Sequence, residues 1–317
     1  MNARLASTAA LAGFFAATLP ARAADSQLLN LVMPDATVLA GVNVNQAKTS
    51  TFGQFVLNQV QTTDIQKLAA ATGFDPTRDV HEVLAAAGPA GSKTGLALAL
   101  GNFNPTQIAA AAAAKGGTTT ETYGGFTIIE DQKQTHGVTF LSTTIAVAGD
   151  VASVKAAIDR AKSTSSSLPA PVLMQVNHWS TTEDAWVIST VPPAALHPAA
   201  GTPTIPGVGP GAAANTALQT IQSAAGGVKF GDNVVVTAQA TSDNAQDAQN
   251  LANTVKLLAA VAQMQAQNNP ALQTLVQSLN ATSTDNIVNI SFSMPETQLQ
   301  ALLTQPHPEV RKPQRKM

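Results

Sequence analysis

The stretch TGFDPTRDVHEVLAAAG, residues 72–88, holds the densest group of charged side chains in the region predicted to fold. Asp75 followed by Pro76 predicts a helix start, because an aspartate can cap a backbone N–H and proline suits the first helical position. Apolar residues then follow at i, i+3, i+4 and i+7, namely Val80, Val83, Leu84 and Ala87. This spacing predicts an amphipathic helix that ends at Gly88-Pro89, with Arg78 and Glu82 paired on its polar face.

The same stretch supplies the candidate catalytic residues Asp79, His81 and Glu82. Carboxylates beside a histidine are typical of general acid–base chemistry. His81-Glu82 also begins the zinc-protease pattern H-E-x-x-H, but Ala85 occupies the position of the second histidine, so no metal site is predicted. The simpler interpretation is a capped helix whose charged face meets water.

The chain begins like an export signal. Arg4 precedes an apolar run over residues 5–19, and the small-x-small triplet Ala21-Arg22-Ala23 follows. This order predicts a signal peptide at residues 1–23, cleaved after Ala23, and a periplasmic or secreted protein. The apolar run is too short to span a membrane comfortably, so no transmembrane segment is expected after cleavage.

The amino-acid composition argues against several kinds of site and partner. The 317 residues include no cysteine, which excludes disulfides, thiolate metal sites and thiol nucleophiles. The net charge is −2 and 4% of the residues are aromatic, which argues against a nucleic-acid partner. The glycines at residues 207–211 lack the lysine of a phosphate-binding loop, and no two of the five histidines are four residues apart, so we expect no cofactor.

Apolar patterning alternates between strands and helices. Strands are predicted at residues 36–44, 94–100, 123–130, 138–148, 185–191, 228–230, 234–240 and 287–294. Helices are predicted at residues 51–62, 64–71, 105–114, 151–161, 172–180, 215–225, 243–267 and 271–279, and after Pro295. Hairpins and half-polar strands favour an α+β fold, with antiparallel sheets covered by helices.

Polar, proline-marked segments divide the chain. The break at residues 163–171 predicts an N-terminal α+β half (24–165) and a C-terminal α+β half (166–305), and a strand–cap–helix pattern that recurs in both suggests that the halves are related. Residues 192–214 are rich in proline and glycine and are predicted to form a long mobile loop. The basic residues 306–317 are predicted to be a disordered tail.

The segment Gly73-Phe74-Asp75-Pro76 with Arg78-Asp79 also occurs in known proteins. Together with Pro34-Asp35-Ala36, Gly101-Asn102-Phe103 and Ala148-Gly149-Asp150, it resembles a group of uncharacterised exported bacterial proteins, over roughly residues 28–191. The resemblance implies an exported α+β protein. It implies no catalytic residue.

These observations favour a non-enzymatic protein that binds a protein or envelope component. The predicted surface is a polar sheet face that includes Asn289, Ser291 and Ser293, with further members at Asn43, Asn45, Thr237 and Gln239. An ordinary solvated sheet face explains the same pattern. The alternatives are a hydrolase that uses Asp79, His81 and Glu82, and a hydrophobic-ligand carrier with a site formed by dispersed residues.

Overall fold

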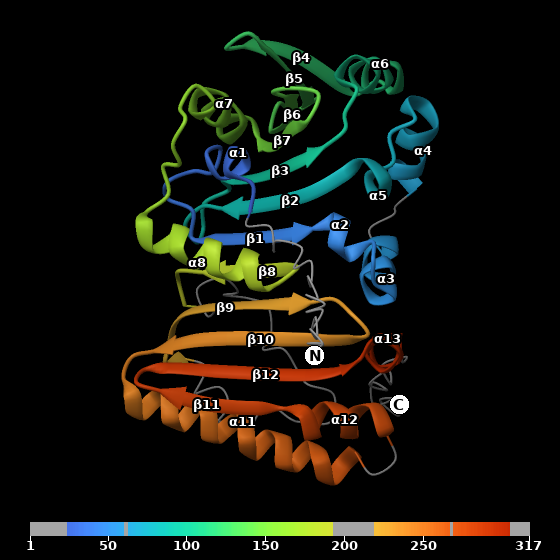
Figure 1. Ribbon diagram of the computed structural model, residues 1–317. Helices are drawn as coiled ribbons and strands as arrows, with labels where there is room; N and C mark the ends of the chain where they lie inside the picture. The colour runs from blue at the N-terminus through green and yellow to red at the C-terminus, as the bar shows by residue number, and fades with distance from the viewer. Residues whose placement is uncertain (1–23, 60–62, 193–218, 267–268, 305–317) are drawn as a thin grey trace, which may run out of the picture.

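A computed structural model describes residues 24–59, 63–192, 219–266 and 269–304. Twelve strands form one antiparallel sheet in the order β11-β12-β10-β9-β8-β1-β2-β3-β7-β6-β5-β4, with helices packed on both faces (Figure 1). The predicted α+β class is confirmed.

The strands are β1 (Val38–Asn43), β2 (Val80–Ala87), β3 (Gly95–Gly101), β4 (Thr118–Tyr123), β5 (Phe126–Asp131), β6 (His136–Phe140), β7 (Ile145–Asp150), β8 (Ala185–Ser189), β9 (Ile221–Lys229), β10 (Asn233–Ser242), β11 (Asn280–Thr284) and β12 (Ile287–Pro295). The helices are α1 (Ser26–Leu29), α2 (Val44–Ala47), α3 (Thr51–Gln59), α4 (Thr63–Thr72), α5 (Pro76–Asp79), α6 (Pro105–Lys115), α7 (Val151–Arg160), α8 (Ala170–Thr182), α11 (Ala245–Gln265), α12 (Pro270–Ser278), α13 (Glu296–Thr304).

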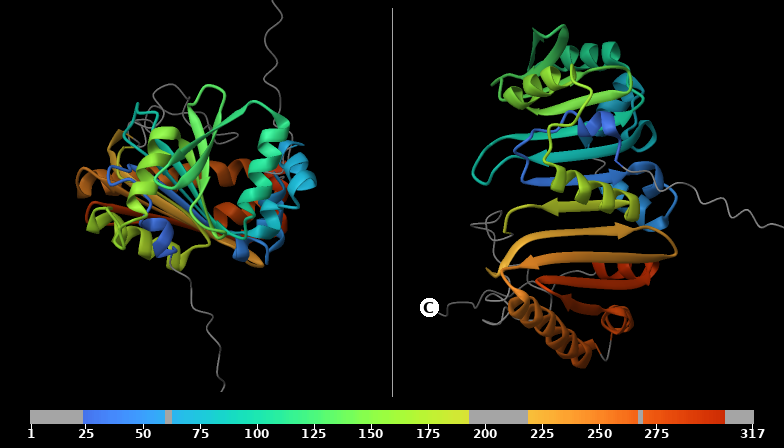
Figure 2. Two further views of the ribbon diagram at one scale, coloured as in Figure 1. Left: turned by 90° about the horizontal axis from the view of Figure 1, so that it is seen from above. Right: turned by 60° about the vertical axis from the view of Figure 1, so that its left-hand side comes forward.

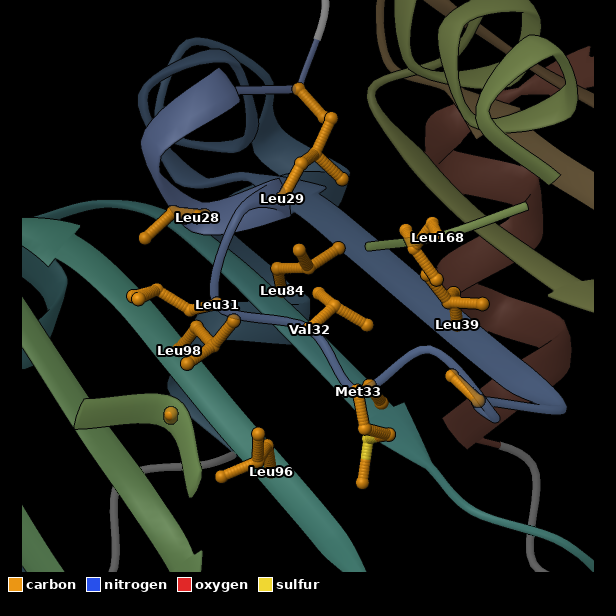
Figure 3. Packing of buried hydrophobic residues seen from close by; sticks show 14 of the residues in the cluster. Leu28, Leu29, Leu31, Val32, Met33, Leu39, Leu84, Leu96, Leu98 and Leu168 are labelled. Carbon is orange, nitrogen blue, oxygen red and sulfur yellow. The ribbon is translucent and has the colours of Figure 1, made fainter. Parts of the chain in front are cut away.

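We call the sheet face that carries Leu39, Leu84 and Trp186 the front face, and the opposite face the back face. Side chains of α1, α7 and α8 cover the front face at the N-terminal end of the sheet, and their apolar residues join those of β1, β2, β3, β7 and β8 in one core. Leu28 of α1, with Leu31 and Val32 just after it, lies over Leu84 and Leu98 (Figure 3). The left view in Figure 2, seen from above the view of Figure 1, shows the yellow-green α7 and the blue-green α6 on opposite sides of the green strands.

Helices also cover the back face. Toward β4, Ile108 of α6 joins Val83 of β2 in one apolar cluster. Toward β11, Leu251 of α11 packs on Val288 of β12, and Phe52 of α3 packs on residues of the β9–β10 hairpin. Each helix lies on the side where the strands beneath it place apolar residues.

The predicted helix over residues 80–87 is wrong. Asp75 does cap a helix, because its carboxylate accepts from the Thr77 N–H, but α5 ends at Asp79 and residues 80–87 form β2 between β1 and β3. Leu84 and Ala86 are buried while Ala85 and Ala87 are exposed, a period of two that the helical spacing concealed. Periodicity alone cannot separate a helix from a strand over so few residues, and here pairing on both sides decides.

A bulge at His81 explains the misleading spacing. Val80 pairs with Gly101 and Glu82 with Leu100, so His81 is an extra residue in β2. The bulge places Val80 on the back face with Val83, and Glu82 on the front face with Leu84.

Four further predictions need correction. The helix expected at residues 215–225 is replaced over its described part by a turn and β9, which begins at Ile221. The strand expected at 123–130 is a hairpin of β4 and β5, turned by Gly124 and Gly125 at positive φ. The strand expected at 138–148 is likewise β6 and β7, and β11 was not predicted. The long helix begins after Asn244, which replaces Asp243 as its cap.

Several predictions lie outside the described residues: the signal peptide, the loop from 193 onward and the basic tail. The single sheet runs across the expected boundary at 163–171, since β8 of the C-terminal half pairs with β1 of the N-terminal half. Within the described ranges, no helix combines the length and the apolar character that a membrane span requires.

Candidate functional site

Asp79 is fixed by its neighbours. Both carboxylate oxygens accept from Arg78, at 2.7 Å each, and one also accepts from the Asp75 backbone N–H at 2.8 Å. The bonds from Arg78 hold the pKa of Asp79 below its ordinary value, in spite of partial burial. A carboxylate held ionised in this way is a structural anchor of the α5 turn and a poor proton acceptor.

His81 and Glu82 have other partners. The His81 Nε2 lies 3.4 Å from the Asn102 amide nitrogen, at the exposed end of β2. Glu82 lies on the front face and accepts from the Asp25 backbone N–H at 3.1 Å. The three candidate catalytic residues are thus adjacent in sequence but are engaged separately.

A pocket of about 270 Å³ lies beside Asp79 on the back-face side. Its walls come from α4, α5, α6 and the end of β3, and include Phe74, Arg78, Asn102, Asn104 and Ile108. His81 and Glu82 are not part of its lining. The pocket gathers one cation, one carboxylate and three amides around three apolar side chains, without the predicted histidine.

The predicted polar sheet face is present on β10 and β12. Thr237 is opposite Ser291, Gln239 is opposite Asn289, and Ser293 follows in the same register. All five side chains project from the front face and are partly exposed, and the Gln239 amide donates to the Asn289 oxygen at 3.1 Å. We call these five residues the polar sheet face.

Two predicted members lie elsewhere. Asn43 ends β1 and its side chain caps α2 by accepting from the Gln46 N–H. Asn45 is an exposed residue of α2. Their alternation with Val42 and Val44 resembled a continuing strand, but the chain turns into a helix at Val44.

Glu183 extends this surface toward α8. A Cβ on Gly227 would lie 2.4 Å from the Glu183 Cγ, so the glycine gives the side chain room to lie flat on β9. One carboxylate oxygen, Oε2, is buried without a hydrogen-bond partner. Burial raises the pKa of Glu183, and a hydrogen bond with Thr237 opposes this only partly.

Asp184 faces a different environment from Glu183. Its carboxylate accepts from the Phe230 N–H at 2.7 Å, and burial raises its pKa. Two adjacent acidic residues before a strand are typical of a turn facing water or of a general acid pair. The structure gives the two residues separate roles: Asp184 anchors the hairpin and Glu183 borders the polar sheet face.

A carboxylate cluster at the other end of the sheet escaped the sequence analysis. The Glu130 side chain is 2% exposed, and its Oε1 has no partner. Burial raises its pKa, as does a hydrogen bond with Glu121, which in turn binds Lys155 of α7 at 2.8 Å. Only the register of β4 and β5 brings the two glutamates together, and no sequence motif marks them.

An apolar groove of about 360 Å³ lies between α6 and the outer strands. Pro105 and Ala109 line one side, and Phe126, Ile129 and Phe140 line the other. This groove is where the hydrophobic-carrier alternative would place a ligand. The described part of the chain holds no group of three or more His, Cys, Asp or Glu residues that could bind a metal ion.

Comparison with known proteins identifies the fold and nothing further. No family model and no curated protein matches the sequence. Among solved structures, crystal form I of TP0453 aligns with a TM-score of 0.55 over 89% of this chain and 98% of that chain, at 11% identity. Crystal form III aligns with a TM-score of 0.56 over 87% and 96%, also at 11% identity. At this identity the likeness concerns the architecture alone.

Proposed function

We propose that this chain is an exported, non-enzymatic binding protein, and that the polar sheet face, together with Glu183, is its recognition surface. The observation that carries the proposal is the register of β10 and β12. It aligns Thr237, Gln239, Asn289, Ser291 and Ser293 on one face, while α11 and α13 pack on the other. A face lined with amides and hydroxyls offers donors and acceptors to a polar partner.

The unpartnered oxygen of Glu183 leads us to expect a partner that donates a hydrogen bond to it. A buried acceptor without a hydrogen bond is costly, by about 1–3 kcal/mol, and a partner that donates to it would recover part of that cost. The surface is spread over two neighbouring strands. It therefore suits a macromolecular partner, an envelope protein or another envelope component, better than a small metabolite.

A capture experiment tests the proposal. The double variant Asn289→Arg/Ser291→Arg places two cations on the polar sheet face, and Gln246→Arg/Gln263→Arg places two on exposed positions of α11. We expect immobilised wild type and the α11 variant to retain the same partner from an envelope extract, and the first variant to lose it. If both variants retain identical partners, this surface is not the binding site.

Export rests on the first 23 residues and has its own test. N-terminal sequencing of the protein recovered from outside the cytoplasm is expected to begin at Ala24. A mature chain that still begins at Met1 would contradict the export half of the proposal.

The apolar groove supports a second candidate, carriage of a hydrophobic ligand. Its volume of about 360 Å³ lies within the range of ligand sites, and two phenylalanines line it. An environment-sensitive fatty-acid probe is expected to bind wild type with 1:1 stoichiometry. It should not bind Ala109→Trp, because the indole fills the groove. Equal probe binding by Ala109→Trp and wild type would remove this candidate. The hydrolase alternative gains less support, because Asp79, His81 and Glu82 have different partners.

A further inference from the structure

The two edges of the sheet differ in how they are protected. At one edge, α11 runs alongside β11, and the Ser283 hydroxyl donates to Gln249 of that helix (Figure 1). At the other edge, β5 is the one described strand that pairs with β4, and no labelled element lies beyond β4 in Figure 1. An edge strand without cover presents free backbone groups to any other strand.

The hairpin turn fixes which groups of β4 are free. Gly124 and Gly125 form a two-residue turn, so Tyr123 and Phe126 are a hydrogen-bonded pair, and bonded pairs then alternate along the strand. Consequently the backbone N–H and C=O groups of Thr118, Thr120 and Thr122 point away from β5. No backbone partner for them exists among the residues that the structure describes.

Protective features are also missing from the strand itself. Its sequence, TTTETY, contains no proline, no lysine and no bulge against β5. Its one charge, Glu121, is held by Lys155 on the α7 side. Threonine is favoured in strands, and threonine pairs across strands are stabilising.

We infer that β4 joins the β4 of a second copy of this chain, antiparallel, about a two-fold axis at Thr120. In this register Thr120 is opposite its own copy and Thr118 is opposite Thr122 of the partner. Every outward N–H and C=O of the three threonines then finds a partner. Glu121 is opposite Thr119, so no like charges meet, which is the condition for a self-complementary interface.

The absence of cysteine makes the register directly testable. Across a hydrogen-bonded antiparallel pair the two Cα atoms lie about 5.5 Å apart, within the range that a disulfide bridges. Thr120→Cys should therefore form a covalent dimer under mild oxidation. In Thr118→Cys the two cysteines would lie roughly 13 Å apart, four residues along the strand, and should not cross-link.

Sedimentation of the full mature chain tests the association without cross-linking. Wild type is expected to show a concentration-dependent monomer–dimer equilibrium. Thr120→Pro removes an outward N–H while sparing the bonds to β5, and it should weaken dimerisation at least tenfold. The control Thr120→Val keeps the backbone N–H and should dimerise like wild type. A monomer at every concentration, or equal cross-linking at positions 118 and 120, would overturn the inference even if the proline variant misfolds.

Discussion

The two ends of the front face are both built from alternating strands, but one end is buried under helices and the other carries partly exposed polar side chains. At the N-terminal end, Leu39, Leu84 and Leu98 project forward into a core roofed by α1, α7 and α8. At the C-terminal end, Thr237, Gln239 and Asn289 occupy the equivalent positions, and the apolar side chains of β10 and β12 project backward onto α11 and α13. At the C-terminal end, helices that the structure describes bury the back face, because the positions of the apolar residues in each strand decide which face is buried. The described part of the chain therefore leaves a polar surface beside a well-packed core.

The largest expected effect comes from the covered end. Leu98→Ala removes a side chain that is fully buried beneath Leu31, and should lower the free energy of unfolding by about 2–5 kcal/mol. Urea unfolding followed by circular dichroism measures it. A loss below about 1 kcal/mol would mean that the front core is loosely packed, and the contrast between the two ends would weaken.

Helix caps give the next contrast. Asp150 accepts from Ser153 at the start of α7 and from the Gly95 N–H of β3, both at 2.9 Å, whereas the exposed Asn244 accepts only within α11. We expect Asp150→Ala to cost about 2 kcal/mol and Asn244→Ala about 0.5–1 kcal/mol in unfolding free energy. Equal losses would show that the bond to β3 adds nothing to the cap.

The pH dependence of Asp150 provides a separate check. Burial raises its pKa, but the hydrogen bonds from Ser153 and Gly95 outweigh burial and leave the pKa below its ordinary value. Its stabilising contribution is therefore present above the unfolded-state pKa of about 3.9 and is lost as the pH falls through the folded-state value. The difference between wild type and Asp150→Ala should shrink in acid.

Some of these structural features can be predicted from the sequence, and others cannot. Clean alternation in residues 287–294 predicted β12 and its polar side correctly, and Asn269 and Asp150 marked two helix starts. The segment 80–87 was wrongly predicted as a helix, because a bulge at His81 gives its apolar residues a helical spacing. Its pairing with β1 and β3 shows that it is a strand. Gly124-Gly125 is a local signal for the β4–β5 hairpin, and the register of that hairpin brings Glu121 close to Glu130. The contact of Glu183 with Gly227 joins segments that are distant in sequence, and no local pattern encodes it.

Glu130 and Glu121, at the β4 end of the sheet, should contribute to the free energy of unfolding with opposite pH dependence. Burial raises the pKa of Glu130, so its contribution to stability is present below the unfolded-state pKa of about 4.3 and is lost as the pH rises through the folded-state value. Glu130→Gln should therefore be more stable than wild type at pH 7 by about 1 kcal/mol, because the amide removes a charge that burial disfavours. Glu121→Gln should be less stable at pH 7, because the bond from Lys155 lowers the pKa of Glu121. Melting temperatures from pH 4 to pH 7.5 would reveal both trends, and a shared sign would mean that the pair titrates as one unit.

The smallest effect on stability is expected on the polar sheet face, and it separates a recognition surface from a structural one. Gln239→Ala and Ser291→Ala each delete a partly exposed polar group from a face that no described helix of this half covers, so each should change the free energy of unfolding by less than about 0.5 kcal/mol. Gln239→Ala also removes the amide that donates to Asn289, and a larger loss there would show that the bond supports the strand pair. If unfolding is unchanged while capture of the partner falls, the polar residues serve recognition. If unfolding and capture are both unchanged, the face is an ordinary solvated surface. Measuring both on the same samples is decisive, because the covered end of the front face cannot separate the two effects: any substitution there that affected binding would first unfold the core.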